Sequence, residues 1–148
     1  MIKTAILWAL RLGLGGLFVY AGVMKLSDPT GFAVEISNYR LLPEMAPWAA
    51  MAMPGVEVAV GALMMAGTRP WLRAASLACI GMMIVFTIAV TQVVARGINI
   101  DCGCFGGNSG PVTWVTIVRD LVLLGAAAGV FLMSGPRSPS ASATAEKD

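Results

Sequence analysis

The sequence lacks histidine, has only three cysteines and carries few charged residues, and each shortage limits the possible chemistry. A closed zinc site usually needs four cysteine or histidine ligands, so we expect no metal site. Electron transfer between two cysteine pairs within one chain would need four cysteines. Any disulfide chemistry must therefore involve another protein or a non-protein carrier such as a quinone.

Charge is also too scarce for a nucleic-acid-binding protein. Only 12% of the 148 residues are charged, about half of the roughly 25% typical of soluble domains. The formal net charge is +2, and no run rich in lysine or arginine forms a phosphate-binding patch. Hydrophobic residues make up 57% of the chain and the mean hydropathy is +0.79. This composition indicates an integral membrane protein.

Long apolar runs define four predicted membrane spans, each long enough to cross a hydrocarbon core as a helix. They cover residues 5–24, 45–67, 71–95 and 112–134. We therefore predict an all-α, antiparallel four-helix bundle over residues 1–135. The polar tail, residues 136–148, has little to bury and is expected to be disordered.

A short helix is predicted between the first two spans, lying in the membrane interface. Asp28 is placed to cap the helix and Pro29 stands at its first position, where a missing backbone N–H costs nothing. Phe32, Ile36 and Tyr39 recur at helical spacing and form one apolar face.

The loop between the last two spans carries Cys102 and Cys104, separated by one glycine. Cysteines this close can form a disulfide. The ring is so small that it restrains little of the unfolded chain, which favours exchange over a stabilising role. A structural turn with incidental cysteines is the alternative. Asp101 opposes ionisation of Cys102, whereas Lys25 or Arg119 nearby would favour it, and Cys104 is the expected attacking thiol.

Charged residues within the spans are expected to pair or to line a wet cavity, because a charge near the bilayer centre costs roughly 2.5–3.5 kcal/mol. Glu57, Arg119 and Asp120 fall in this class, and we predict a Glu57–Arg119 pair beneath the cysteine loop. The pair could simply lock two helices together, or it could tune the thiols. Arg11 is expected to reach the interface as a structural residue, and Cys79 to behave as a small hydrophobic residue.

Basic residues near the span ends predict the orientation. One side collects more of them than the other, so both termini are placed in the cytoplasm, with the protein in the inner membrane. The cysteine loop then faces the periplasm, where disulfides persist. The first side has Lys3, Arg11, Arg69, Arg73, Arg137 and Lys147, and the second has Lys25, Arg40 and Arg96.

Several motifs taken together resemble the methylamine utilization MauE family, within the wider DoxX-like membrane proteins. The resemblance covers nearly the whole chain apart from the tail. The motifs are Tyr20-Ala-Gly with Lys25, Asp28-Pro29 and Phe32; Tyr39-Arg-Leu-Leu-Pro43; Pro54-Gly-x-Glu57; Asp101-Cys-Gly-Cys-Phe-Gly106; and Trp114 with Arg119-Asp120.

The resemblance implies a four-helix membrane protein linked to thiol redox chemistry, with Cys102 and Cys104 as the redox pair. Glu57, Arg119 and Asp120 would support that pair. It further implies maturation of the methylamine dehydrogenase small subunit, together with an exported thioredoxin-like protein. Two other functions stay open: a non-catalytic assembly or anchoring subunit, and a small-molecule carrier that uses the Glu57–Arg119 pair.

Overall fold

The computed structural model describes residues 1–41, 43–102 and 110–135. Every regular element in these ranges is a helix, which confirms the predicted all-α class. Four of the described helices are long and apolar enough to cross a membrane. In chain order, the elements are α1 (Ile2–Ser27), α2 (Pro29–Asn38), the 3₁₀ helix η1 (Pro43–Met45), α3 (Ala46–Ala66), α4 (Arg69–Ala95) and α5 (Trp114–Met133).

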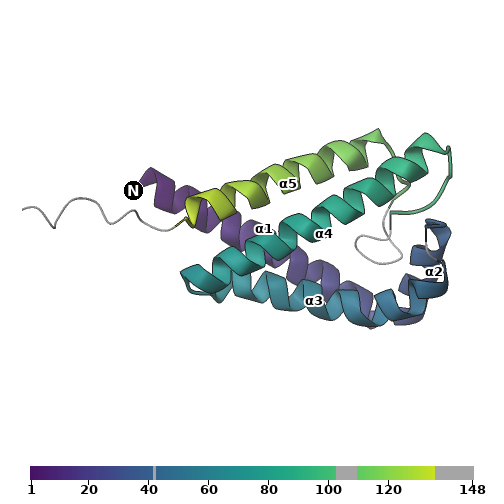
Figure 1. Ribbon diagram of the computed structural model, residues 1–148, viewed down its shortest axis with the longest axis horizontal. Helices are drawn as coiled ribbons and strands as arrows, with labels where there is room; N and C mark the ends of the chain where they lie inside the picture. Colours follow the sequence, from purple (N-terminus) through teal and green to yellow (C-terminus); the bar gives the residue numbers. More distant parts are fainter. Residues whose placement is uncertain (42, 103–109, 136–148) are drawn as a thin grey trace, which may run out of the picture.

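The long helices run antiparallel, so the connections alternate between the two ends of the bundle (Figure 1). The N-terminus, the α3–α4 turn and the end of α5 lie at one end. The short helix α2 and the segment that carries Cys102 lie at the other. The predicted tail, residues 136–148, falls outside the described residues.

The helix α2 begins as the sequence predicts. Asp28 is its N-cap, the Asp28 side chain accepts a hydrogen bond from the Gly31 backbone N–H at 2.9 Å, and Pro29 is the first helical residue. That hydrogen bond lowers the pKa of Asp28 the most, and a weaker effect in the same direction comes from the Thr30 side chain, because both hydrogen bonds stabilise the charged form of Asp28. The cap fixes where the chain turns out of α1 and so positions α2 over the end of the bundle.

Glycines allow α1 and α3 to approach closely, and α3 continues through Pro54. A Cβ placed on Gly15 would lie 2.7 Å from the Gly61 carbonyl oxygen, and one on Gly61 would lie 2.6 Å from the Gly15 carbonyl oxygen. Gly22 makes the same kind of contact with the Pro54 carbonyl. Small residues at such crossings let backbones pack together in a membrane. A Cβ placed on Gly13 would meet no atom within 4 Å, so Gly13 takes no part in the crossing.

We expect Gly61→Ala to destabilise the bundle, because the added methyl group would overlap backbone atoms that cannot move aside. The expected loss is about 1–3 kcal/mol, the usual cost of overpacking. Gly13→Ala adds the same methyl group to open space and should be neutral or slightly stabilising. Unfolding of the detergent-solubilised protein by SDS titration measures both. Equal stability of the two variants would show that the close approach at Gly61 is not required.

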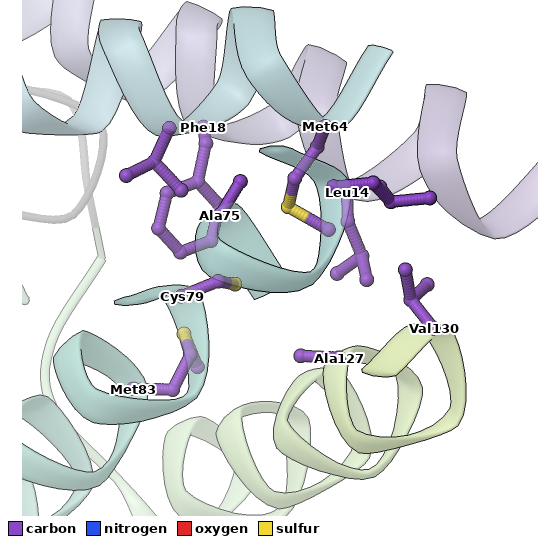
Figure 2. Close-up of a cluster of buried hydrophobic side chains, with 10 residues drawn as sticks. Leu14, Phe18, Met64, Ala75, Cys79, Met83, Ala127 and Val130 are labelled. Atoms are coloured by element: carbon purple, nitrogen blue, oxygen red, sulfur yellow. The ribbon is translucent and has the colours of Figure 1, made fainter. Parts of the chain in front are cut away.

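Two hydrophobic clusters fill the bundle, one toward each end. The larger joins all four long helices near the α3–α4 turn and includes Leu14, Met64 and Val130 (Figure 2). Cys79 lies within this cluster, fully buried and free, as expected for a cysteine that packs as a hydrophobic residue. The smaller cluster, around Tyr39, Val90, Val93 and Ile117, lies beneath the cysteine segment.

Arg11 is buried within the bundle and caps α3, so the expectation that it reaches the interface was wrong. Its guanidinium donates hydrogen bonds to the carbonyls of Met64 at 2.9 Å, Met65 at 3.1 Å and Gly67 at 2.8 Å. These are carbonyls of the last turn of α3, which have no partner within the helix. A cation at a helix C-terminus also interacts favourably with the helix dipole. Arg11 therefore has a structural role, as predicted, but it fulfils that role by capping the C-terminus of α3.

Candidate functional site

The segment that leads to Cys102 is held in place on both sides of the cysteine loop. Asp101 and Pro111 form an isolated antiparallel β-bridge. The Cys102 backbone N–H donates to the Gly110 carbonyl at 3.1 Å. These contacts close the base of the loop, so Cys102 has a fixed position beside the N-terminal part of α5.

Cys102 is buried, with 4% of its surface exposed, and is disulfide-bonded. Arg119, on α5, places its Nη2 atom 3.6 Å from the Cys102 sulfur. A guanidinium at this distance favours a thiolate over a thiol whenever the cysteine is reduced. Cys104, the other member of the predicted redox pair, lies outside the described residues.

Tyr39 ties the end of α2 to the cysteine segment and to α4. Its hydroxyl donates to the Cys102 carbonyl oxygen at 2.6 Å, and its own carbonyl accepts from Gln92 Nε2 at 2.7 Å. Burial, above all, raises the pKa of Tyr39, so the phenol stays protonated and keeps donating. In the sequence Tyr39 appears only as part of the apolar face of the predicted interfacial helix, so this role could not be read from the helical pattern.

The predicted Glu57–Arg119 pair was wrong. Glu57 pairs with Lys25, whose Nζ lies 2.5 Å from Glu57 Oε1, and both side chains are largely buried. Arg119 pairs with its neighbour Asp120 at 3.0 Å. The second carboxylate oxygens, Glu57 Oε2 and Asp120 Oδ2, are buried without a hydrogen-bond partner among the described residues.

The two ion pairs and Cys102 all border one cavity of about 680 Å³. Side chains from all five α-helices line it, and most are apolar, including Phe18, Phe86 and Met83. The cavity therefore brings together all of the predicted site residues that the structure describes. These are Lys25, Glu57, Cys102, Arg119 and Asp120.

Glu35, on α2, is a further polar residue of this cavity that the sequence analysis missed. In the sequence it stands directly before Ile36, off the apolar face that Phe32, Ile36 and Tyr39 form, and this position is typical of a residue that stays in polar surroundings. In the structure its Oε2 is buried without a partner among the described residues. Burial raises its pKa and the charges of Asp101 and Asp28 add to this, whereas Lys25 opposes it. Its place in the last turn of α2 gave no sequence signal of this environment.

These features define a class: a membrane protein of four long apolar helices, with a disulfide-bonded cysteine above a partly charged cavity. The family model described as "Methylamine utilisation protein MauE" matches residues 3–133. The chain therefore belongs to the MauE family.

Two curated relatives carry the same description. Methylamine utilization protein MauE of Paracoccus denitrificans is 38% identical over 126 residues, which cover 83% of this chain and 67% of the relative. That of Paracoccus versutus is 39% identical over 140 residues, which cover 92% and 74% respectively. No solved structure gives a significant match.

Proposed function

We propose that this protein carries out thiol-disulfide exchange on the periplasmic face of the inner membrane through Cys102 and Cys104. The observation that carries the proposal is the environment of Cys102: a buried, disulfide-bonded sulfur beside the Arg119 guanidinium. A positive charge there lowers the cost of forming a thiolate when the disulfide is opened. The exchange would support disulfide formation in, or maturation of, an exported protein.

The distribution of charge supports the periplasmic placement of the site. Lys3, Arg69 and Arg73 belong to the end of the bundle that holds the N-terminus and the α3–α4 turn. The positive-inside rule assigns that end to the cytoplasm, and the cysteine segment lies at the opposite end (Figure 1). The relatives are named for methylamine utilization, so we propose a cysteine-containing client in that process and an exported thioredoxin-like partner.

The test is to trap the mixed disulfide through which exchange must pass. Cys102 is buried, which suits the resolving cysteine, so Cys104 would be the cysteine that bonds to the partner in the mixed disulfide. We expect Cys102→Ser to accumulate a reductant-sensitive adduct with an exported thioredoxin-like protein, and Cys104→Ser to accumulate less. Non-reducing gels followed by identification of the bound protein provide the measurement.

Cys79→Ser is the matched control, because Cys79 is buried in the other cluster and is not part of the site. It should trap nothing and leave exchange intact. The reverse ranking of Cys102→Ser and Cys104→Ser would exchange their roles. Absence of an adduct from both variants at normal protein levels would argue against exchange with a protein partner.

A further inference from the structure

The cavity beneath Cys102 has the character of a ligand site in a membrane. Its volume of about 680 Å³ lies within the roughly 300–1,000 Å³ of small-molecule pockets. Apolar side chains dominate its wall, and the charged groups are few and belong mainly to two ion pairs. An apolar body with a small number of polar attachment points is therefore the kind of ligand that it fits.

The cavity opens toward the lipid. The helices α3 and α4 meet at their turn and diverge toward α2 (Figure 1). Ala78, Gly81 and Val85 on α4 line the cavity and are also exposed, and Gly81 lies near the middle of that helix. Met45, just before α3, lines it as well and is 56% exposed. A ligand dissolved in the bilayer could enter by this side without crossing water.

The polar groups of the cavity include both hydrogen-bond donors and unsatisfied acceptors. Lys25 and Arg119 carry N–H donors, whereas Asp120 is 1% exposed and its Oδ2 has no partner among the described residues. Glu57 Oε2 and Glu35 Oε2 are also buried and also have no hydrogen-bond partner among the described residues. A buried acceptor without a partner is costly unless a ligand or water satisfies it. The site thus suits a ligand that has carbonyl oxygens in one state and hydroxyl groups in another.

From these features we infer that the cavity binds a lipid-soluble quinone, which accepts the electrons of the reduced Cys102–Cys104 pair. This inference rests on the proposed exchange function. In the step, the two thiols lose two electrons and two protons and form the S–S bond. The quinone gains both electrons and both protons and becomes the quinol. Carbonyl oxygens would accept from Lys25 and Arg119, and the quinol hydroxyls would donate to the buried carboxylate oxygens.

The small number of cysteines also requires an electron acceptor outside the chain. The chain has three cysteines, and Cys79 lies free in the other hydrophobic cluster. The sequence therefore has no second cysteine pair whose disulfide could accept the electrons of the first, so they must pass to another molecule. Cys102 itself borders the cavity, which puts the sulfur next to the place where the acceptor would bind.

The experiment uses the full chain in lipid nanodiscs, reduced and then freed of reductant without oxygen. Decylubiquinone is the probe, since its fully substituted ring cannot form a covalent adduct with a thiol. We expect one quinol for every two thiols lost, measured by quinone absorbance and by thiol labelling. Ala78→Phe fills the cavity wall and should slow this reaction by about tenfold or more, as steric changes in an apolar pocket do.

Ala74→Phe is the matched control, because Ala74 is exposed one turn earlier on α4 and does not line the cavity. It should react like the unmodified protein. Should Ala78→Phe fail to fold, Gly81→Leu replaces it, with Gly125→Leu on α5 as its control. Neither glycine has an atom within 4 Å of an added Cβ.

The outcomes separate this inference from the proposed function. Quinol formation at equal rates in Ala78→Phe and Ala74→Phe would overturn the cavity as the site. If the protein exchanges with a thioredoxin-like protein but forms no quinol, the quinone inference would be overturned and the exchange function would remain. Failure of both reactions would remove the exchange function as well.

Discussion

Lys25→Met is expected to lower the free energy of unfolding by about 3–5 kcal/mol, the usual cost of breaking a buried ion pair. The cause is the Glu57 carboxylate, which would lose its only described partner while its side chain stays 12% exposed. Lys25 also lies 5.0 Å from the centre of the Phe32 ring, so its loss removes a cation–π contact between α1 and α2.

The double variant Lys25→Met/Glu57→Met tests that explanation. Replacing both charges by apolar side chains of similar size is often neutral or stabilising, so it should recover most of the loss. Lys3→Met makes the same chemical change at an exposed position of α1 and should have little effect. SDS titration of the purified protein gives the unfolding free energies. A double variant as unstable as Lys25→Met would contradict the pairing as the source of the effect.

The second large effect concerns Arg119. We expect Arg119→Gln to reduce the reactivity of the reduced Cys102 thiol by about tenfold. A unit charge 3.6 Å from the sulfur is worth roughly 1–5 kcal/mol between the dielectric limits of water and a protein surface. The lower end of this energy range applies because 39% of the Arg119 side chain is exposed, so solvent screens its charge. Arg119→Lys keeps the charge and should retain most of the reactivity.

The measurement is the alkylation rate of the reduced protein as a function of pH, in a variant that lacks Cys79 and Cys104. Loss of a nearby cation should move this profile toward higher pH, which a purely structural change would not do. Arg119→Gln also strands the buried Asp120. The double variant Arg119→Gln/Asp120→Asn removes that charge and should show the same shifted profile in a more stable protein. An unshifted profile in both would exclude Arg119 from thiol activation.

Much of the architecture could be predicted from the sequence because it depends on local signals. Apolar runs long enough to cross a bilayer define the four long helices, and Asp28 with Pro29 marks the start of α2. The polar cysteine loop follows from its composition between two such runs. None of these predictions requires knowledge of which helices touch.

The errors arose where contacts between helices decide the outcome. The sequence indicates the depth of Glu57 and Arg119 in the membrane but not the rotation of their helices. In addition, α1 continues to Ser27, so Lys25 lies within the helix rather than in the connection where the apolar run ended. That extra turn brings Lys25 to Glu57 and leaves Arg119 beside Asp120 and Cys102. The cavity was missed for the same reason, since it exists only between packed helices.

The contacts of α1 bear on how the protein enters the membrane during synthesis. This helix carries two buried cations, Arg11 and Lys25, and their described hydrogen-bond acceptors all belong to α3 or directly follow it. Alone in lipid, each cation would cost up to roughly 2.5–3.5 kcal/mol. The two cations of the nascent first helix therefore have none of these acceptors until α3 leaves the ribosome. The charge pattern favours transfer of the two helices into the bilayer together, as a preassembled hairpin.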